Sequence, residues 1–134
     1  MTKYGRDDLT WDQLTEAGLE VLLECARRGD LIAYGDLNSE LERRTGIPGF
    51  DFNRPDERAA LGHLLWLIVE RNRPETGMMI SALVIYKGAS DPGPGFFGLA
   101  ADLGLLPRRP SADEKDEFWT KQVTGLHAHY ANGG

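Results

Sequence analysis

Cysteine is nearly absent from this sequence of 134 residues, in which Cys25 is the single thiol. One cysteine excludes an intramolecular disulfide and any zinc site built from several cysteines of the same chain. Histidine is also scarce. His127 and His129 lie two positions apart on a predicted helix, so their side chains point to different faces and cannot chelate one metal ion. We therefore expect no metal site and no cofactor.

Long apolar runs are absent too. No stretch approaches the roughly 20 apolar residues that a membrane-spanning helix needs. The first residues, from Met1 to Asp8, lack the apolar core of a signal peptide. These absences predict a cytoplasmic protein that does not enter a membrane. Arginine outnumbers lysine and glycine is abundant, which is typical of bacterial chains from genomes of high GC content.

The sequence has no run of basic residues. Its net charge is −6 and its isoelectric point is about 5.0. DNA affinity comes mainly from neutralising phosphates, so an acidic chain needs a segregated basic face to bind a duplex. The densest basic pairs, Arg27-Arg28, Arg43-Arg44 and Arg108-Arg109, each have acidic neighbours. Nucleic acid is therefore our second choice of partner.

The hydrophobic content and the length of the chain predict one folded domain. Hydrophobic residues make up 41% of the chain, enough to bury a core, and the length suits a single domain over residues 1–134. We expect residues 1–9 to form a flexible N-terminus and residues 131–134 to fray. The expected fold class is α/β: a small, mainly helical domain of about five helices with a short sheet of two or three strands.

Local signals place the elements of this domain. Thr10 and Gln13 have the spacing of a capping box, and Gly29 ends the helix that follows. Ser111 and Glu114 form a second capping box. The predicted elements, in order, are helix 10–28, strand 31–33, helix 34–45, loop 47–54, helix 55–72, loop 73–77, strand 79–86, turn 87–95, helix 96–103, linker 105–110 and helix 111–130. In the last helix, Trp119, Val123, Leu126 and Tyr130 form one apolar stripe, which we expect to pack on the first helix.

This order of elements resembles the DNA-binding half of the alkylguanine-DNA alkyltransferase and alkyltransferase-like family, a winged-helix scaffold. The resemblance covers residues 19–106. The Tyr-Gly-Asp-Leu sequence at 34–37 matches the start of one family helix, and Arg-Ala-Ala-Leu-Gly at 58–62 matches the start of the recognition helix. The family's Pro-Cys-His-Arg site would fall near Ile80–Leu83, where this chain has no cysteine, histidine or arginine. The resemblance therefore implies a winged-helix fold without alkyl transfer.

The helix over residues 55–72 has two interpretations. Together with helix 34–45 it could form a helix-turn-helix, which requires polar side chains directed at base edges. Its centre, Leu64-Leu-Trp-Leu-Ile-Val69, is apolar almost all round, and such a helix is usually buried on several sides. We favour a core helix, with Leu65 and Ile68 buried. A contiguous basic face containing Arg43, Arg44, Arg54 and Arg58 would instead favour DNA.

The candidate binding residues lie in this helix and in the loop before it. Trp66 lies away from its buried stripe, and an exposed aromatic residue can anchor an interface. The preceding loop, Phe-Asp-Phe-Asn-Arg at 50–54, could cradle a base or a peptide, although loop aromatics more often complete a core. The candidate binding residues are Phe50, Phe52, Arg54, Arg58 and Trp66.

No motif for catalysis stands out. The turn over residues 91–97 lacks the spacing of a phosphate-binding loop, and Ser81 has no partnered histidine nearby in the sequence. We therefore expect a non-enzymatic binding module that recognises another protein or self-associates. The alternative is a winged-helix DNA-binding protein, and an unrecognised hydrolase comes third. An inhibitor or immunity protein, whose acidity would block a basic target, is also compatible with the charge.

Overall fold

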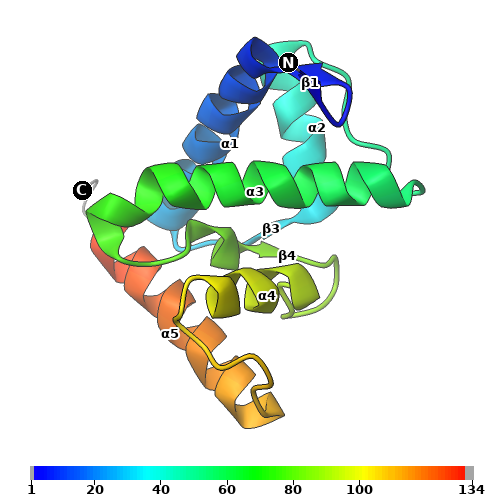
Figure 1. Ribbon diagram of the computed structural model, residues 1–134. Coiled ribbons are helices and arrows are strands. Elements are labelled where there is room, and N and C mark those ends of the chain that lie inside the picture. Colours follow the sequence, from blue (N-terminus) through cyan, green and yellow to red (C-terminus); the bar gives the residue numbers. More distant parts are fainter. Residues whose placement is uncertain (1, 132–134) are drawn as a thin grey trace.

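Five α-helices and two short strand pairs make up the fold, which a computed structural model describes for residues 2–131 (Figure 1). The helical elements are α1 (Asp8–Arg28), α2 (Tyr34–Thr45), α3 (Pro55–Thr76), the 3-10 helix η1 (Ile80–Leu83), α4 (Pro94–Asp102) and α5 (Ala112–Tyr130). The strands are β1 (Thr2–Lys3), β2 (Arg6–Asp7), β3 (Ile32–Ala33) and β4 (Val84–Ile85). The prediction of a small, mainly helical domain with a short sheet is confirmed.

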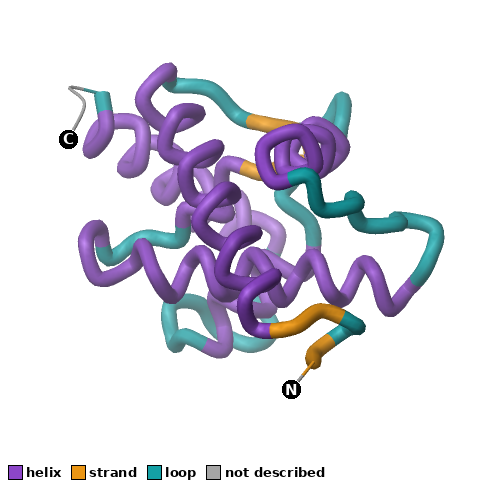
Figure 2. The backbone as a smooth tube through the Cα atoms, turned by 90° about the horizontal axis from the view of Figure 1, so that it is seen from above, coloured by secondary structure: helices purple, strands orange, loops and turns teal. Residues whose placement is uncertain are grey.

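The two strand pairs lie at separate places in the molecule (Figure 2). β1 and β2 form an antiparallel hairpin at the N-terminus. β3 and β4 pair in parallel, with Ile32 opposite Val84 and Ala33 opposite Ile85. No strand within residues 2–131 is longer than two residues, so helix packing and not a sheet organises the core.

The N-terminal segment differs from the expectation of a flexible stretch over residues 1–9. Residues 2–7 form the hairpin, and the Trp11 indole donates a hydrogen bond to the Lys3 carbonyl (3.0 Å). Helix α1 begins at Asp8, because the Asp7 carboxylate accepts from the Thr10 amide (2.8 Å) and acts as the N-cap. Thr10 is thus inside the first turn and is not the cap.

The second capping box, Ser111 with Glu114, is confirmed. We predicted that residues 131–134 fray, and residues 132–134 of this stretch lie outside the described part of the chain.

Helix α3 is one turn longer than predicted. The expected loop over residues 73–77 is wrong, because the helix continues through Pro74 to Thr76. Proline removes one helical N–H donor, but Pro74 is exposed and sits in the last turn, where only one ladder bond is lost. The helix ends at Gly77, whose φ of 72° is left-handed and whose amide donates to the Arg73 carbonyl (2.7 Å).

The predicted strand over residues 79–86 is mostly a helical turn. Residues 80–83 form η1, and only Val84 and Ile85 are extended. Helices α1, α3 and α5 surround η1 and bury its residues, while Val84 and Ile85 pair with β3. The α5 side chains also bond its backbone: the Trp119 indole donates to the Ala82 carbonyl (2.8 Å). Burial alone therefore did not distinguish a strand from a buried 3-10 turn.

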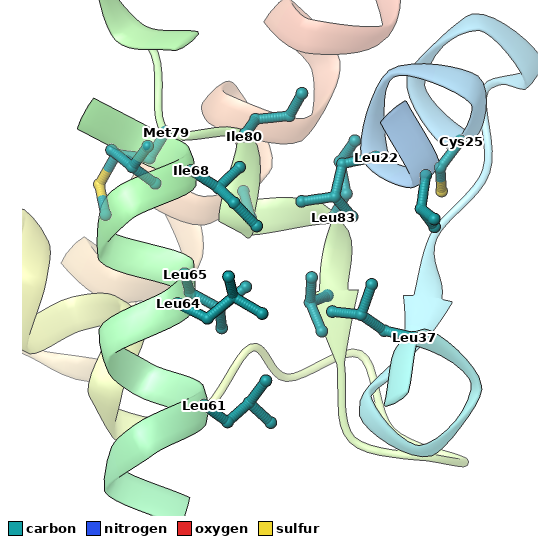
Figure 3. Close-up of a cluster of buried hydrophobic side chains, with 14 of the residues drawn as sticks. Leu22, Cys25, Leu37, Leu61, Leu64, Leu65, Ile68, Met79, Ile80 and Leu83 are labelled. Carbon is teal, nitrogen blue, oxygen red and sulfur yellow. The ribbon is translucent and has the colours of Figure 1, made fainter. Parts of the chain in front are cut away.

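The core lies between α3, α1 and the η1–β4 segment (Figure 3). Leu61, Leu64 and Ile68 point from α3 toward Leu83, which follows the pattern predicted for this helix. Leu65, Ile68, Leu83 and Val84 are all buried, as predicted. Helix α5 packs on α1 and η1, so its apolar stripe is covered by this chain's own core. None of the helices within residues 2–131 has the length and apolar content to cross a bilayer.

Candidate binding cleft

An open cleft of about 840 Å³ lies beside helix α3, between its first half, helix α4 and the segment after β4. We call it the aromatic cleft. Helix α3 packs on α1 and η1 with its buried face, while α4 runs beneath it in the view of Figure 1. The cleft is lined by Tyr34, Gly35, Phe52, Arg58, Leu61, Gly62, Leu65, Trp66, Ser81, Tyr86, Lys87, Gly95, Phe96, Gly98, Leu99 and Asp102.

Two aromatic side chains in the wall of the cleft stay open to solvent. Trp66 is 39% exposed and Tyr86 is 49% exposed. The indole of Trp66 stacks on the imidazole of His63, with ring centroids 5.6 Å apart, and His63 packs edge-on against Trp11. His63 therefore supports the Trp66 ring while part of that ring stays in contact with solvent, as expected of a preformed interface anchor.

Tyr86 is held in a similar way from the other side of the cleft. Its ring lies 5.1 Å from that of Tyr34 and directly over Gly93, where an added Cβ would come within 2.7 Å of Tyr86 Cε2. The Tyr34 hydroxyl donates to the Pro92 carbonyl (2.7 Å). Burial raises the pKa of Tyr34 to about 12, and the nearby Tyr86 and Asp91 add to this effect. The Tyr34 hydroxyl therefore remains a hydrogen-bond donor even at alkaline pH, and its bond to Pro92 ties down the turn that follows Tyr86.

The charged groups of the cleft are unequal in sign. Arg58 donates to the Phe52 carbonyl (2.7 Å), and neither Arg58 nor Lys87 has a carboxylate partner among residues 2–131. Asp102 is paired with Arg108 (2.6 Å). The lining of the cleft therefore includes two cations without a carboxylate partner among residues 2–131, although the chain as a whole carries a net charge of −6.

The structure brings three of the five predicted binding residues together. Phe52, Arg58 and Trp66 all line the aromatic cleft. Phe50 does not, because it is a core residue only 6% exposed. Its ring packs under the Arg6 guanidinium (4.4 Å), which also pairs with Glu57. Arg54 does not line the cleft either.

The basic face considered for DNA binding is largely neutralised. Arg44 pairs with Glu24 (2.8 Å) and with Glu40 (2.9 Å). Arg43 pairs with Glu40 as well, and Arg54 pairs with Asp56 (2.6 Å). Of the four arginines that would form such a face, Arg58 alone has no carboxylate partner within the described residues.

A second, smaller hollow of about 450 Å³ adjoins the first. It is lined by Trp66, Val69, Glu70, Arg73, Pro74, Gly77 and Leu103. Trp66 lines both hollows and is 39% exposed. Together the two hollows follow most of the length of this helix.

Sequence reasoning missed several lining residues. Tyr34, Ser81 and Tyr86 were assigned to a helix start and a strand, since no local pattern shows that a later helix faces them across a cleft. One signal was available: Gly62 and Gly98 stand in predicted helix interiors, where glycine disfavours the helix without ending it. No protein-family model matches this chain, and neither the curated proteins nor the solved structures contain a match.

Proposed function

We propose that this protein is a non-enzymatic binding module whose aromatic cleft docks an apolar segment of a partner protein. The observation that carries the proposal is the exposed Trp66 ring, which lines two hollows of about 840 and 450 Å³. Aromatic residues near the centre of a concave apolar surface are typical anchors of protein interfaces. Two hollows in line along one helix suit an extended segment better than a single compact ligand.

The chemistry of the cleft supports a binding role over a hydrolytic one. A serine nucleophile needs a base within hydrogen-bonding distance. The Ser81 hydroxyl has no hydrogen-bond partner among the described residues, and the lining includes no histidine or cysteine. Asp102, the carboxylate of the lining, is exposed and engaged with Arg108. These arrangements provide recognition surfaces and no activated nucleophile.

Charge supports a protein partner over a nucleic acid. Duplex binding relies on several free cations aligned with phosphates. Arg43, Arg44 and Arg54 are each paired with a carboxylate of this chain. We expect duplex affinity in the non-specific range, with a dissociation constant of about 10⁻⁴ to 10⁻⁶ M or weaker at physiological salt. Winged-helix DNA binding remains the second candidate function.

Site-directed photo-crosslinking tests the proposal. A photoreactive benzoylphenylalanine replaces Tyr86 in the full chain, which is irradiated in cells of the native host. The matched control replaces Tyr4, an aromatic residue of the hairpin that is 41% exposed and lies outside the cleft. We expect protein adducts, identified by mass spectrometry, from position 86 and not from position 4.

Other outcomes count against the proposal. Adducts of equal yield from both positions would mean that the cleft is not the docking surface. Adducts to DNA from position 86 would favour the second candidate function. An adduct to a second copy of this chain would convert the docking proposal into self-association, which sedimentation of the purified protein would verify.

A further inference from the structure

Helix α3 presents an exposed tryptophan between two arginines on one of its faces. Arg58 and Trp66 line the aromatic cleft, and Trp66 and Arg73 line the smaller hollow. A helix turns by about 100° per residue, so the three positions fall within an arc of about 80°. It rises by about 1.5 Å per residue, which places Arg58 about 12 Å and Arg73 about 10 Å from Trp66 along the helix axis. We call these three residues the α3 row.

The two arginines of the α3 row have no carboxylate partner among residues 2–131. Arg58 donates to the Phe52 carbonyl (2.7 Å), but a guanidinium carries five N–H donors, so several remain for a ligand. Glu70, in the lining of the smaller hollow, also forms no ion pair within the described residues. Its position lies about 120° around the helix from Arg58, outside the arc of the α3 row. The row therefore offers a ligand two cations.

The surface beside the α3 row is apolar and is built by two helices. Leu61, Leu65 and Val69 of α3 line the hollows at intervals of four residues. Helix α4 and its C-cap add Leu99 and Leu103 to the lining. Rows of side chains four residues apart are the ridges between which a further helix packs. The two hollows together therefore suit the packing of a helix from another protein.

A helical ligand fits this surface better than an extended one. An extended segment must find partners for its own backbone N–H and C=O groups, which a strand edge usually supplies. Within residues 2–131, no residue of a strand lines either hollow, and β4 is already paired with β3. A helix satisfies its backbone groups internally and can bury an apolar face in a groove.

We infer that the two hollows receive an amphipathic helix of the partner, which carries an acidic residue seven positions before and seven positions after a central apolar residue. This inference rests on the proposed function. Residues seven apart lie on the same face of a helix and about 10 Å apart along its axis, close to the spacing of the α3 row. The two carboxylates pair with Arg58 and Arg73, and the apolar face between them packs over Trp66. Charge complementarity thereby sets the register of the partner helix.

Titration calorimetry of the full chain with four blocked peptides tests the inference. The on-face peptide is acetyl-AEQALAQALQAALQAEA-amide, whose glutamates lie seven residues before and after the central leucine. The off-face peptide, acetyl-AAQELAQALQAALEAQA-amide, has the same composition and charge, but its glutamates lie on the opposite side of the helix. In the two remaining peptides, both glutamates of the on-face peptide are replaced with glutamine or with lysine.

We expect the on-face peptide to bind tightest. The off-face and glutamine peptides should bind about three- to tenfold more weakly, as the loss of two exposed ion pairs implies. The lysine peptide should bind most weakly. This order is specific to the α3 row, because the net charge of −6 on the whole chain would by itself favour the lysine peptide.

Variants of the chain locate the charges that set this order. The advantage of the on-face over the off-face peptide should shrink in Arg73→Gln and disappear when Arg58→Gln is added. Arg71→Gln is the matched control and should keep the full advantage, since Arg71 is exposed on another face of α3 and lines neither hollow. Thermal melting verifies that the variants fold as the parent does.

Equal affinity for the on-face and off-face peptides, or tighter binding of the lysine peptide, would overturn the inference. An on-face advantage that persists in the double variant, or that is lost in Arg71→Gln, would overturn it as well, as would failure of all four peptides to bind. The proposed function is judged separately by the crosslinks from position 86. Protein adducts there, combined with no on-face advantage, would keep the docking function and reject this occupant.

Discussion

Gly18 of α1 lies so close to Ile68 of α3 that a Cβ atom on Gly18 would come within 2.6 Å of the Ile68 Cδ1 atom. Helices α1 and α3 therefore pack closely at this point because Gly18 has no side chain. Gly62, on the same helix as Ile68, has nothing within 4 Å of its Cβ position. The two glycines have opposite roles: one permits packing, and the other keeps the aromatic cleft open.

Alanine substitutions at these two glycines should change stability in opposite directions. Gly62→Ala should raise the free energy of unfolding by up to about 1 kcal/mol, because alanine favours a helix interior over glycine and the space is open. Gly18→Ala should lower it, since Ile68 must move to relieve the contact. Chemical denaturation measures both. A loss of stability in Gly62→Ala would show that this glycine has a structural role that we have not recognised.

Two core leucines should be costly to truncate. Leu65 of α3 and Leu83 of η1 are both buried, so replacing either with alanine should destabilise the protein by about 2–5 kcal/mol. Leu9→Ala is the control, because Leu9 is 66% exposed on α1. Thermal melting should show a clear loss for the two core variants and little change for the control. An unchanged melting temperature in Leu65→Ala would contradict the placement of that side chain in the core.

Helix α5 should be necessary for a soluble fold. Besides covering η1, it bonds two backbone groups there: Gln122 accepts from the Met79 amide (2.7 Å), and Trp119 donates to the Ala82 carbonyl (2.8 Å). Deleting residues 111–134 would expose the core and leave these groups without protein partners. We expect the truncated chain to aggregate, as measured by light scattering. A truncated chain that stays monomeric and equally stable would show that α5 is covered by a partner instead.

Acid should weaken the contact between α1 and α2. Hydrogen bonds from Arg43 and Arg44 lower the pKa of Glu40 to about 2 from its ordinary 4.5, and the Arg44 hydrogen bond lowers the pKa of Glu24. Because these folded-state pKa values lie below the unfolded ones, the stabilisation is complete above about pH 4.5 and disappears as the pH falls toward 2. Glu24, Glu40 and Arg44 are each partly exposed, so solvent screens these pairs and we expect a modest effect.

The Arg44→Gln variant tests this pH dependence. Its melting temperature should fall less steeply than that of the parent protein between pH 4.5 and 2. Arg71→Gln is the control, since Arg71 is exposed on α3 and has no ion pair among residues 2–131. Parallel pH profiles for the parent and Arg44→Gln would contradict the predicted contribution of this cluster.

Much of the helical architecture was predictable because its signals are local. Gly46 correctly predicted the end of α2, and the Ser111 capping box correctly predicted the start of α5. Leu65 and Ile68 gave the buried stripe of α3. The helical turn at residues 80–83 was not predictable, because a fully buried apolar run has no period that separates a strand from a 3-10 turn.

The candidate site was predictable only in part, for a similar reason. Phe52, Arg58 and Trp66 were identified as binding candidates because each is an unusual residue for its local setting. Their neighbours across the cleft, Ser81 and Tyr86, come from a distant segment whose position depends on tertiary packing. Phe50 looked identical to Phe52 in the sequence, but Phe50 is buried against Trp11 and Arg6, which are distant in the sequence, while Phe52 lines the cleft.

The central claim is that the aromatic cleft docks a partner protein. Its most direct test is the yield of the crosslinked adduct from benzoylphenylalanine at position 86, compared between Gly62→Leu and Ala59→Leu. The first variant fills the cleft, and the second adds the same side chain at an exposed position of α3 outside it. We predict that the protein adduct is lost in Gly62→Leu and retained in Ala59→Leu. An adduct of equal yield in both variants would contradict the account.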